Sequence, residues 1–150
     1  MAELTGGEFQ KDGIPLTKKV AKFYLDKYSG QVERDELGVV TLNERGVKDS
    51  LAHGIGKLKS AAFAAVPKII TNGKIVDSQA NWKNRGYDSY VIAAPIKIGN
   101  SGYVGFVIVT KKGESNRFYL HEVTPQKNLR NGFKTSRAGT PLGDIIQSIL

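Results

Sequence analysis

The chain has 150 residues, of which 40% are hydrophobic, and this size and composition suit one compact domain with its own core. The lack of cysteine excludes disulfides, thiolate metal sites and cysteine nucleophiles, and no apolar run is long enough to span a membrane. The 22 Lys and Arg against 14 Asp and Glu give a formal net charge of +8, which favours nucleic acid or an acidic protein as partner. A basic surface can also serve solubility alone.

Residues 1–14 contain several glycines and no apolar periodicity. They are predicted to be a flexible leader or junction in front of a single domain over residues 15–150. From Pro15 onward, apolar residues recur every three or four positions, which predicts a first helix. Proline suits the first turn of a helix, and Gly30 provides a stop at its other end.

Two further helices are predicted in the first half of the chain. A short β-branched run at residues 39–42 indicates a strand, and Asn43 behind it is a suitable cap for a helix that ends near Gly54. A third helix is predicted over residues 56–72, because its alanines and larger apolar residues fall on one face. Pro67 is expected to bend or interrupt it.

The second half of the chain is predicted to be mostly strand. Residues 74–77 suit a short strand, and three longer runs follow at 87–98, 103–110 and 116–124. The sequence Gly-Asn-Ser-Gly at 99–102, between the first two of these runs, is typical of a hairpin turn. Helices followed by an antiparallel meander indicate an α+β fold.

The last predicted strand carries the most informative residues. Alternation along it puts Phe118 and Leu120 on one face of the sheet. The other face receives a cation, a phenol and an imidazole, from Arg117, Tyr119 and His121. If helices cover the apolar face, these three side chains form a row on an open face. The alternative is an ordinary solvated face of mixed polar residues.

The chain has only two histidines. Besides His121 there is His53, which ends the second predicted helix. A helix C-terminus favours the protonated imidazole. The glycines that follow let backbone amides approach a phosphate, and Lys57 and Lys59 add positive charge at the start of the next helix. The alternative for His53 is a helix-end residue that bonds a carbonyl group.

Two histidines with nearby cations meet the requirements of metal-free RNA cleavage. The 2′-hydroxyl must lose a proton and the 5′-oxygen must gain one, and imidazoles titrate near neutrality. His53 and His121 could share these two steps, and the sequence leaves open which of them is the base. Lys57, Arg117 or Tyr119 could stabilise the pentavalent phosphorane. DNA, which lacks the 2′-hydroxyl, would be bound and not cut.

A loop between two predicted strands carries Trp82, Lys83 and Arg85. The indole can stack on an unpaired base while the two cations hold its phosphates, so we expect this loop to contact RNA. The alternative is a tryptophan that anchors the loop to the core. With no cysteine, two histidines and few acids in the second half, the sequence predicts no metal site and no cofactor.

Four motifs stand in order along the chain, at residues 43–54 (NERGVKDSLAHG), 57–63 (KxxxAAF), 82–90 (WKxRGYDSY) and 116–123 (NRFYLHEV). Together they resemble the family called large polyvalent protein-associated domain 3, over roughly residues 31–136. That family occurs in phage polyvalent proteins and at the C-termini of bacterial polymorphic and contact-dependent inhibition toxins. It is placed in the barnase–EndoU–colicin–RelE superfamily of metal-independent ribonucleases. The resemblance implies N-terminal helices packed on a roughly four-stranded antiparallel sheet.

The residues and the resemblance together predict a metal-independent endoribonuclease toxin that leaves a 2′,3′-cyclic phosphate on its RNA, with tRNA suspected. The expected catalytic residues are His53, His121, Lys57, Tyr119 and Arg117. The expected RNA-binding residues are Lys59, Trp82, Lys83, Arg85, Lys134 and Ser136.

The resemblance also implies partners and a location. Besides RNA, we expect a cognate immunity protein of acidic character, and a domain that is monomeric when free. It would be the C-terminal module of a secreted or delivered bacterial or phage protein, acting in the target-cell cytoplasm in interbacterial competition or phage–host conflict. The alternatives are a non-catalytic nucleic-acid-binding module and a domain that only docks phage or delivery proteins.

Overall fold

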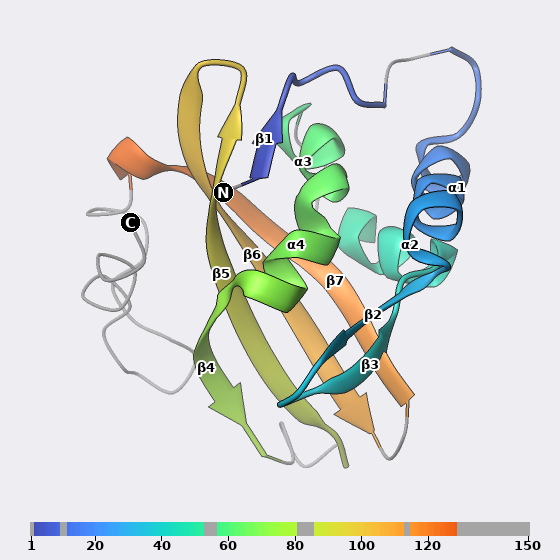
Figure 1. Cartoon of the computed structure of the whole chain (residues 1–150), viewed down its shortest axis with the longest axis vertical. Coiled ribbons are helices and arrows are strands. Elements are labelled where there is room, and N and C mark those ends of the chain that lie inside the picture. The colour runs from blue at the N-terminus through green and yellow to red at the C-terminus, as the bar shows by residue number, and fades with distance from the viewer. Residues whose placement is uncertain (1, 10–11, 53–56, 81–85, 113–114, 129–150) are drawn as a thin grey trace.

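The computed structural model describes residues 2–9, 12–52, 57–80, 86–112 and 115–128, with the side chains of all of them except residues 57–59, 115 and 128. A twisted mixed sheet of five strands forms the centre of the fold (Figure 1). Its strands β5 (Asp88–Ile98), β6 (Ser101–Lys112) and β7 (Ser115–Pro125) form an antiparallel meander. On the other edge of β5, β4 (Lys74–Gln79) pairs antiparallel and β1 (Ala2–Leu4) pairs parallel.

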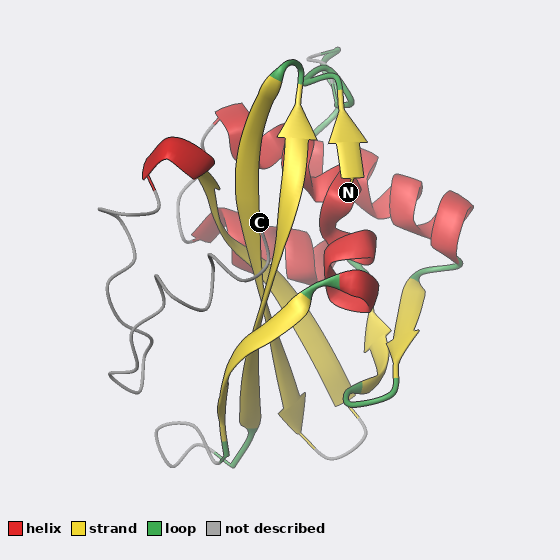
Figure 2. Ribbon diagram, turned by 60° about the vertical axis from the view of Figure 1, so that its left-hand side comes forward, coloured by secondary structure: helices red, strands yellow, loops and turns green. Residues whose placement is uncertain are grey.

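The α-helices lie together on one side of this sheet (Figure 2). In chain order they are α1 (Leu16–Tyr28), α2 (Glu44–Ala52), α3 (Lys57–Ala62) and α4 (Val66–Asn72), with the 3₁₀ turn η1 (Phe63–Ala65) between the last two. A separate hairpin of β2 (Gln31–Arg34) and β3 (Gly38–Thr41) connects α1 with α2, and a second 3₁₀ turn, η3 (Gln126–Asn128), follows β7.

The predicted helices are confirmed within the described residues, and the predicted stop of the second one near Gly54 lies outside them. α1 begins directly after Pro15 and ends at Tyr28. Ser29, which caps it, and Gly30, the predicted stop, both have a positive φ. The side-chain oxygen of Asn43 accepts a hydrogen bond from the Gly46 amide at 3.0 Å and so caps α2. The third predicted helix is interrupted by η1, and Pro67 lies in the first turn of the helix that follows.

The prediction of a roughly four-stranded antiparallel sheet is wrong in two respects, because the sheet has five strands and one of them is parallel. The parallel strand β1 lies within residues 1–14, over which the sequence predicts a flexible leader. It is held to β5 by its ladder, and the Leu4 carbonyl also accepts a hydrogen bond from the Gly99 amide at 2.8 Å. Three residues contain too little alternation to predict a strand, so only the tertiary pairing defines it. The strand β2 is also absent from the sequence prediction.

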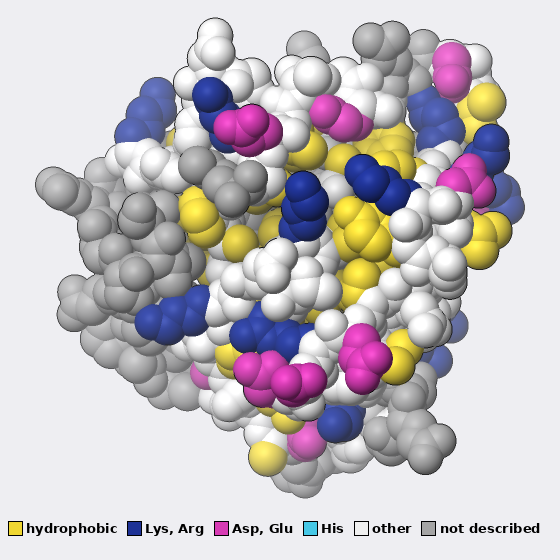
Figure 3. All heavy atoms as spheres, viewed as in Figure 1, with side chains coloured by type: hydrophobic (Ala, Val, Ile, Leu, Met, Phe, Trp, Pro, Cys, Tyr) yellow, Lys and Arg dark blue, Asp and Glu magenta, His cyan; other side chains and the backbone are white. Residues whose placement is uncertain are grey.

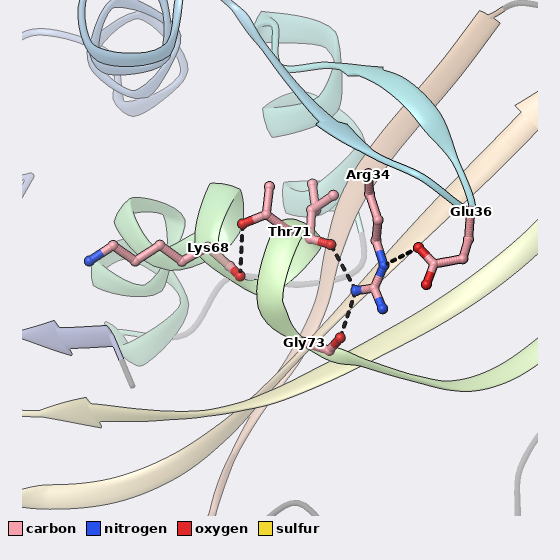
Figure 4. Close-up of polar contacts among 6 residues, drawn as sticks. Arg34, Glu36, Lys68, Thr71 and Gly73 are labelled. Atoms are coloured by element: carbon pink, nitrogen blue, oxygen red, sulfur yellow. Dashed lines mark hydrogen bonds and ion pairs between the residues drawn. The ribbon is translucent and has the colours of Figure 1, made fainter.

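Arg34 joins the β2–β3 hairpin to the end of α4 (Figure 4). Its guanidinium donates hydrogen bonds to the carbonyl oxygens of Ile70 at 3.0 Å and Gly73 at 2.6 Å. It also forms an ion pair with Glu36 at 2.9 Å. A cation at these carbonyl groups satisfies acceptors that the helix leaves open and complements the negative end of its dipole.

The main core lies between the helices and the sheet. Tyr24 at its centre is fully buried, and its hydroxyl donates a hydrogen bond to the Phe63 carbonyl oxygen at 2.7 Å. Burial raises the pKa of this hydroxyl well above its usual range. A second, smaller cluster of buried apolar residues lies on the opposite face of the sheet: Val76, Val91, Ala93, Val104, Phe106 and Ile108. Strands β5 and β6 are therefore apolar on both faces.

Candidate functional site

Strand β7 positions the residues that the sequence singles out. Its alternation is confirmed as far as Leu120, because Phe118 and Leu120 are buried against the helices. Arg117 and Tyr119 point to the opposite face, where Arg117 is exposed and Tyr119 is half-buried against the second apolar cluster. The face that carries these side chains is thus apolar at its centre, and the polar row lies along its β7 edge.

A β-bulge interrupts the alternation at His121. In the ladder between β6 and β7, Leu120 is opposite Val107 and Glu122 is opposite Phe106, so His121 is the extra residue. Both His121 and Glu122 are exposed. The sequence does not predict this bulge, which puts Glu122 opposite Phe106, on the face of Tyr119. The ring of His121 remains close to that of Tyr119, with centroids 6.3 Å apart and planes at 72°.

The sequence around the bulge explains why it forms. In a regular strand Glu122 would be opposite Gly105, on the side of the sheet that the helices cover. A carboxylate buried there without a partner would cost several kcal/mol, on the order of the penalty for burying an unpaired charge. With the bulge, Val123 is opposite Gly105 and packs against the main core, and Glu122 reaches solvent.

Helix α2 approaches β7 closely because two small residues face the strand. A Cβ atom at Gly46 would overlap the ring of Phe118. One turn later, the Ser50 hydroxyl accepts a hydrogen bond from the Leu120 amide at 2.8 Å and donates one to the Gly46 carbonyl at 2.7 Å. These two contacts lie within the motif at residues 43–54, which thereby docks α2 on the strand of the candidate site.

Asn116 makes a third attachment at the start of β7. Its side-chain amide donates hydrogen bonds to the carbonyl oxygens of Leu37 at 2.7 Å and Val39 at 2.8 Å. These bonds fix the β2–β3 hairpin beside the strand, ahead of Arg117. The strand is therefore held at its outer edge by the hairpin and by α2, and the candidate residues sit on a rigid element.

Most of the other predicted site residues lie outside the described residues: His53, Trp82, Lys83, Arg85, Lys134 and Ser136. The backbone of Lys57 and Lys59 is described and belongs to α3, and their side chains are not. α3 packs against β7, so the structure brings the helix of Lys57 next to the strand of His121.

The helix side of the molecule carries charges of both signs, with Lys and Arg interspersed among Asp and Glu (Figure 3). Several of them pair locally, as Lys18 does with Glu44 at 3.1 Å and Lys19 with Asp12 at 3.2 Å. The hydrogen bond from Lys18 lowers the pKa of the Glu44 carboxyl.

Within the described ranges, no group of three or more His, Asp or Glu side chains is placed to hold a metal ion. No helix in the same part of the chain is long and apolar enough to cross a membrane.

Sequence reasoning did not single out three residues that shape the site: Gly46, Ser50 and Glu122. Gly46 and Ser50 lie four residues apart, which places them on one helix face, and this spacing of small residues is a signal for close helix packing. Glu122 could have been found from the break in alternation, because the apolar positions Phe118 and Leu120 are followed by Val123.

Comparison with known proteins adds one finding. A family model described as "Large polyvalent protein-associated domain 3" matches residues 14–119. The match includes α1 and ends within β7, at Tyr119. Comparisons with curated proteins and with solved structures find no match.

Proposed function

The chain belongs to the large polyvalent protein-associated domain 3 family, and from this premise we propose that it is a metal-independent endoribonuclease. The observation that carries the proposal is the short stretch of β7 with Arg117, Tyr119, His121 and Glu122. They supply a cation, a phenol, an imidazole and a carboxylate next to one another on a rigid strand. Acid–base cleavage of a phosphodiester requires a proton acceptor, a proton donor and a group that stabilises the phosphorane, and these side chains can supply all three functions.

The attachment of α2 to β7 supports a role for both histidines. Ser50 bonds the amide of Leu120, the neighbour of His121, and His53 follows three residues after Ser50 in the chain. Connectivity thus favours two imidazoles that serve the same phosphodiester.

In the proposed reaction, one histidine removes the proton of the 2′-hydroxyl, and the 2′-oxygen attacks the adjacent phosphorus. The bond from phosphorus to the 5′-oxygen breaks, and the other histidine protonates that oxygen. The products are a 2′,3′-cyclic phosphate and a 5′-hydroxyl. Arg117, Tyr119 and Lys57 are proposed to stabilise the charge on the phosphorane. Glu122, exposed beside His121, is a further candidate for the base.

The proposed partners follow from the net charge of +8 and from the family. RNA, with tRNA as the first substrate to test, would be held by cations, including those of the loop with Trp82, Lys83 and Arg85. An immunity protein of acidic character would cover the same surface. The domain would act as a toxin or effector module in the cytoplasm of the target cell.

Incubation of the purified chain with total RNA and with tRNA in EDTA tests the proposal. We expect cleavage at the same rate in EDTA and in Mg²⁺, and no cleavage of DNA of the same sequence. A His121→Ala preparation, purified in the same way, controls for contaminating ribonuclease. Loss of cleavage in EDTA with recovery in Mg²⁺ would contradict the mechanism, and binding without cleavage would favour a nucleic-acid-binding module.

A further inference from the structure

Ser50 is a fully buried polar residue at the contact between α2 and β7. A serine inside a helix often donates a hydrogen bond to the carbonyl group four residues earlier, and Ser50 donates one to the Gly46 carbonyl at 2.7 Å. The Ser50 hydroxyl also accepts a hydrogen bond from the Leu120 amide at 2.8 Å, and this second bond connects α2 to the sheet. Donor and acceptor are both used, so the orientation of the hydroxyl is defined.

The Leu120 amide is the last one before the bulge. Leu120 is still opposite Val107 in the regular ladder, and the next residue, His121, is the extra residue of the bulge. Because the Leu120 amide bonds Ser50, it points outward from the sheet toward α2. Leu120 itself is fully buried, so an amide without this partner would be cut off from water.

A bulge can shift along a strand when nothing fixes its position. A shift by one residue would change which of His121 and Glu122 occupies the extra position and would turn both side chains. The Ser50 bond fixes the backbone on one side of the bulge, and Val123, packed on the main core, fixes it on the other. Gly46 keeps α2 close enough for the bond, because it leaves room for the Phe118 ring.

We infer that Ser50 is a positioning residue for His121, an inference that rests on the proposed function. Its hydroxyl holds the bulge in register and so sets the direction in which the imidazole points. Ser50 does not contact the RNA, and it acts through the backbone of Leu120.

The test compares Ser50→Ala with a matched variant, Tyr24→Phe. Each removes one buried hydroxyl with a hydrogen bond to the backbone, and Tyr24→Phe keeps the ring that packs edge-on against Phe118. Both variants are measured at a temperature at which each is at least 95% folded by circular dichroism. The readouts are kcat and KM for RNA cleavage and the NMR chemical shifts of the Leu120 amide and the His121 imidazole.

We expect Ser50→Ala to lower kcat by about tenfold or more with less than about a twofold change in KM, since a misplaced acid or base loses rate rather than affinity. Its Leu120 and His121 resonances should move, while Tyr24→Phe keeps parental kcat and parental His121 shifts. Ser50→Thr, which retains the hydroxyl, should recover a large part of kcat if it folds.

Parental His121 shifts in Ser50→Ala would overturn the inference, and so would shifted resonances with a parental kcat. An equal loss of kcat in Tyr24→Phe would overturn it too, because the effect would then be one of stability. If the parental chain does not cut RNA at all, the proposed function fails, and the NMR comparison alone decides whether Ser50 orients His121.

Discussion

Replacing Gly46 with Ala is expected to lower the free energy of unfolding by about 3 kcal/mol, the upper end of the usual cost of overpacking a core. This expected loss of stability is opposite in sign to the effect of helix propensity, which favours alanine over glycine by about 1 kcal/mol. The new Cβ atom would overlap the ring of Phe118, which is buried and lies edge-on to Tyr24 with centroids 5.8 Å apart. Helix α2 cannot withdraw without breaking the bond between Ser50 and Leu120.

Urea unfolding followed by circular dichroism measures this effect. The matched control is Lys48→Ala in the same helix, whose side chain is 65% exposed and which should change stability by less than about 0.5 kcal/mol. Adding Phe118→Leu to Gly46→Ala should cost less than the two changes separately, because the smaller side chain makes room for the methyl group. A Gly46→Ala protein as stable as the parent would refute the close contact between α2 and β7.

Replacing His121 with Ala is expected to lower the rate of RNA cleavage on the order of a hundredfold or more, the usual scale for a general acid or base. The side chain is exposed on the bulge, so the thermal midpoint should stay near that of the parent. His121→Gln, which can bond and cannot titrate near neutrality, should be as slow as His121→Ala. Affinity for RNA should persist in both, since the cations remain.

Two further variants sharpen this prediction. Lys127→Ala removes an exposed cation from η3, just beyond β7, and should leave the rate within a factor of about two. The double change of His53 and His121 to Ala should be less harmful than the product of the single changes, because both act on one reaction path. If His121→Ala cleaves RNA at the parental rate, the assignment of His121 as an acid or base is wrong. The base would then be sought at Glu122 or Tyr119.

The sequence predicts the helices of this fold well because their ends have local chemical causes. Pro15 and Asn43 begin two helices, and Pro67 lies where the third is interrupted, and each acts through its own backbone or side chain. The long strands β5, β6 and β7 are also predictable, since each is eleven or twelve residues long and contains several β-branched or aromatic residues. The strand β1 is not, because three residues gain their conformation only from pairing with β5.

The candidate site is predictable in composition and not in geometry. The types of residue on β7 indicate the chemistry, and alternation places Arg117 and Tyr119 correctly on one face. Alternation does not predict the bulge at His121, because the bulge depends on where Glu122 and Val123 would lie relative to the core. That relation follows only from the pairing of β7 with β6 and from the helices that cover this side of the sheet.

The central claim is that the 2′-hydroxyl of RNA is the nucleophile and that no metal ion takes part. The most direct measurement is the chemistry of the RNA ends produced in EDTA, together with a substrate that carries a single 2′-deoxynucleotide at the cleaved position. The account predicts 2′,3′-cyclic phosphate and 5′-hydroxyl ends, and no cleavage of the 2′-deoxy substrate. Ends with a 5′-phosphate and a 3′-hydroxyl, or cleavage of the 2′-deoxy substrate, would contradict it.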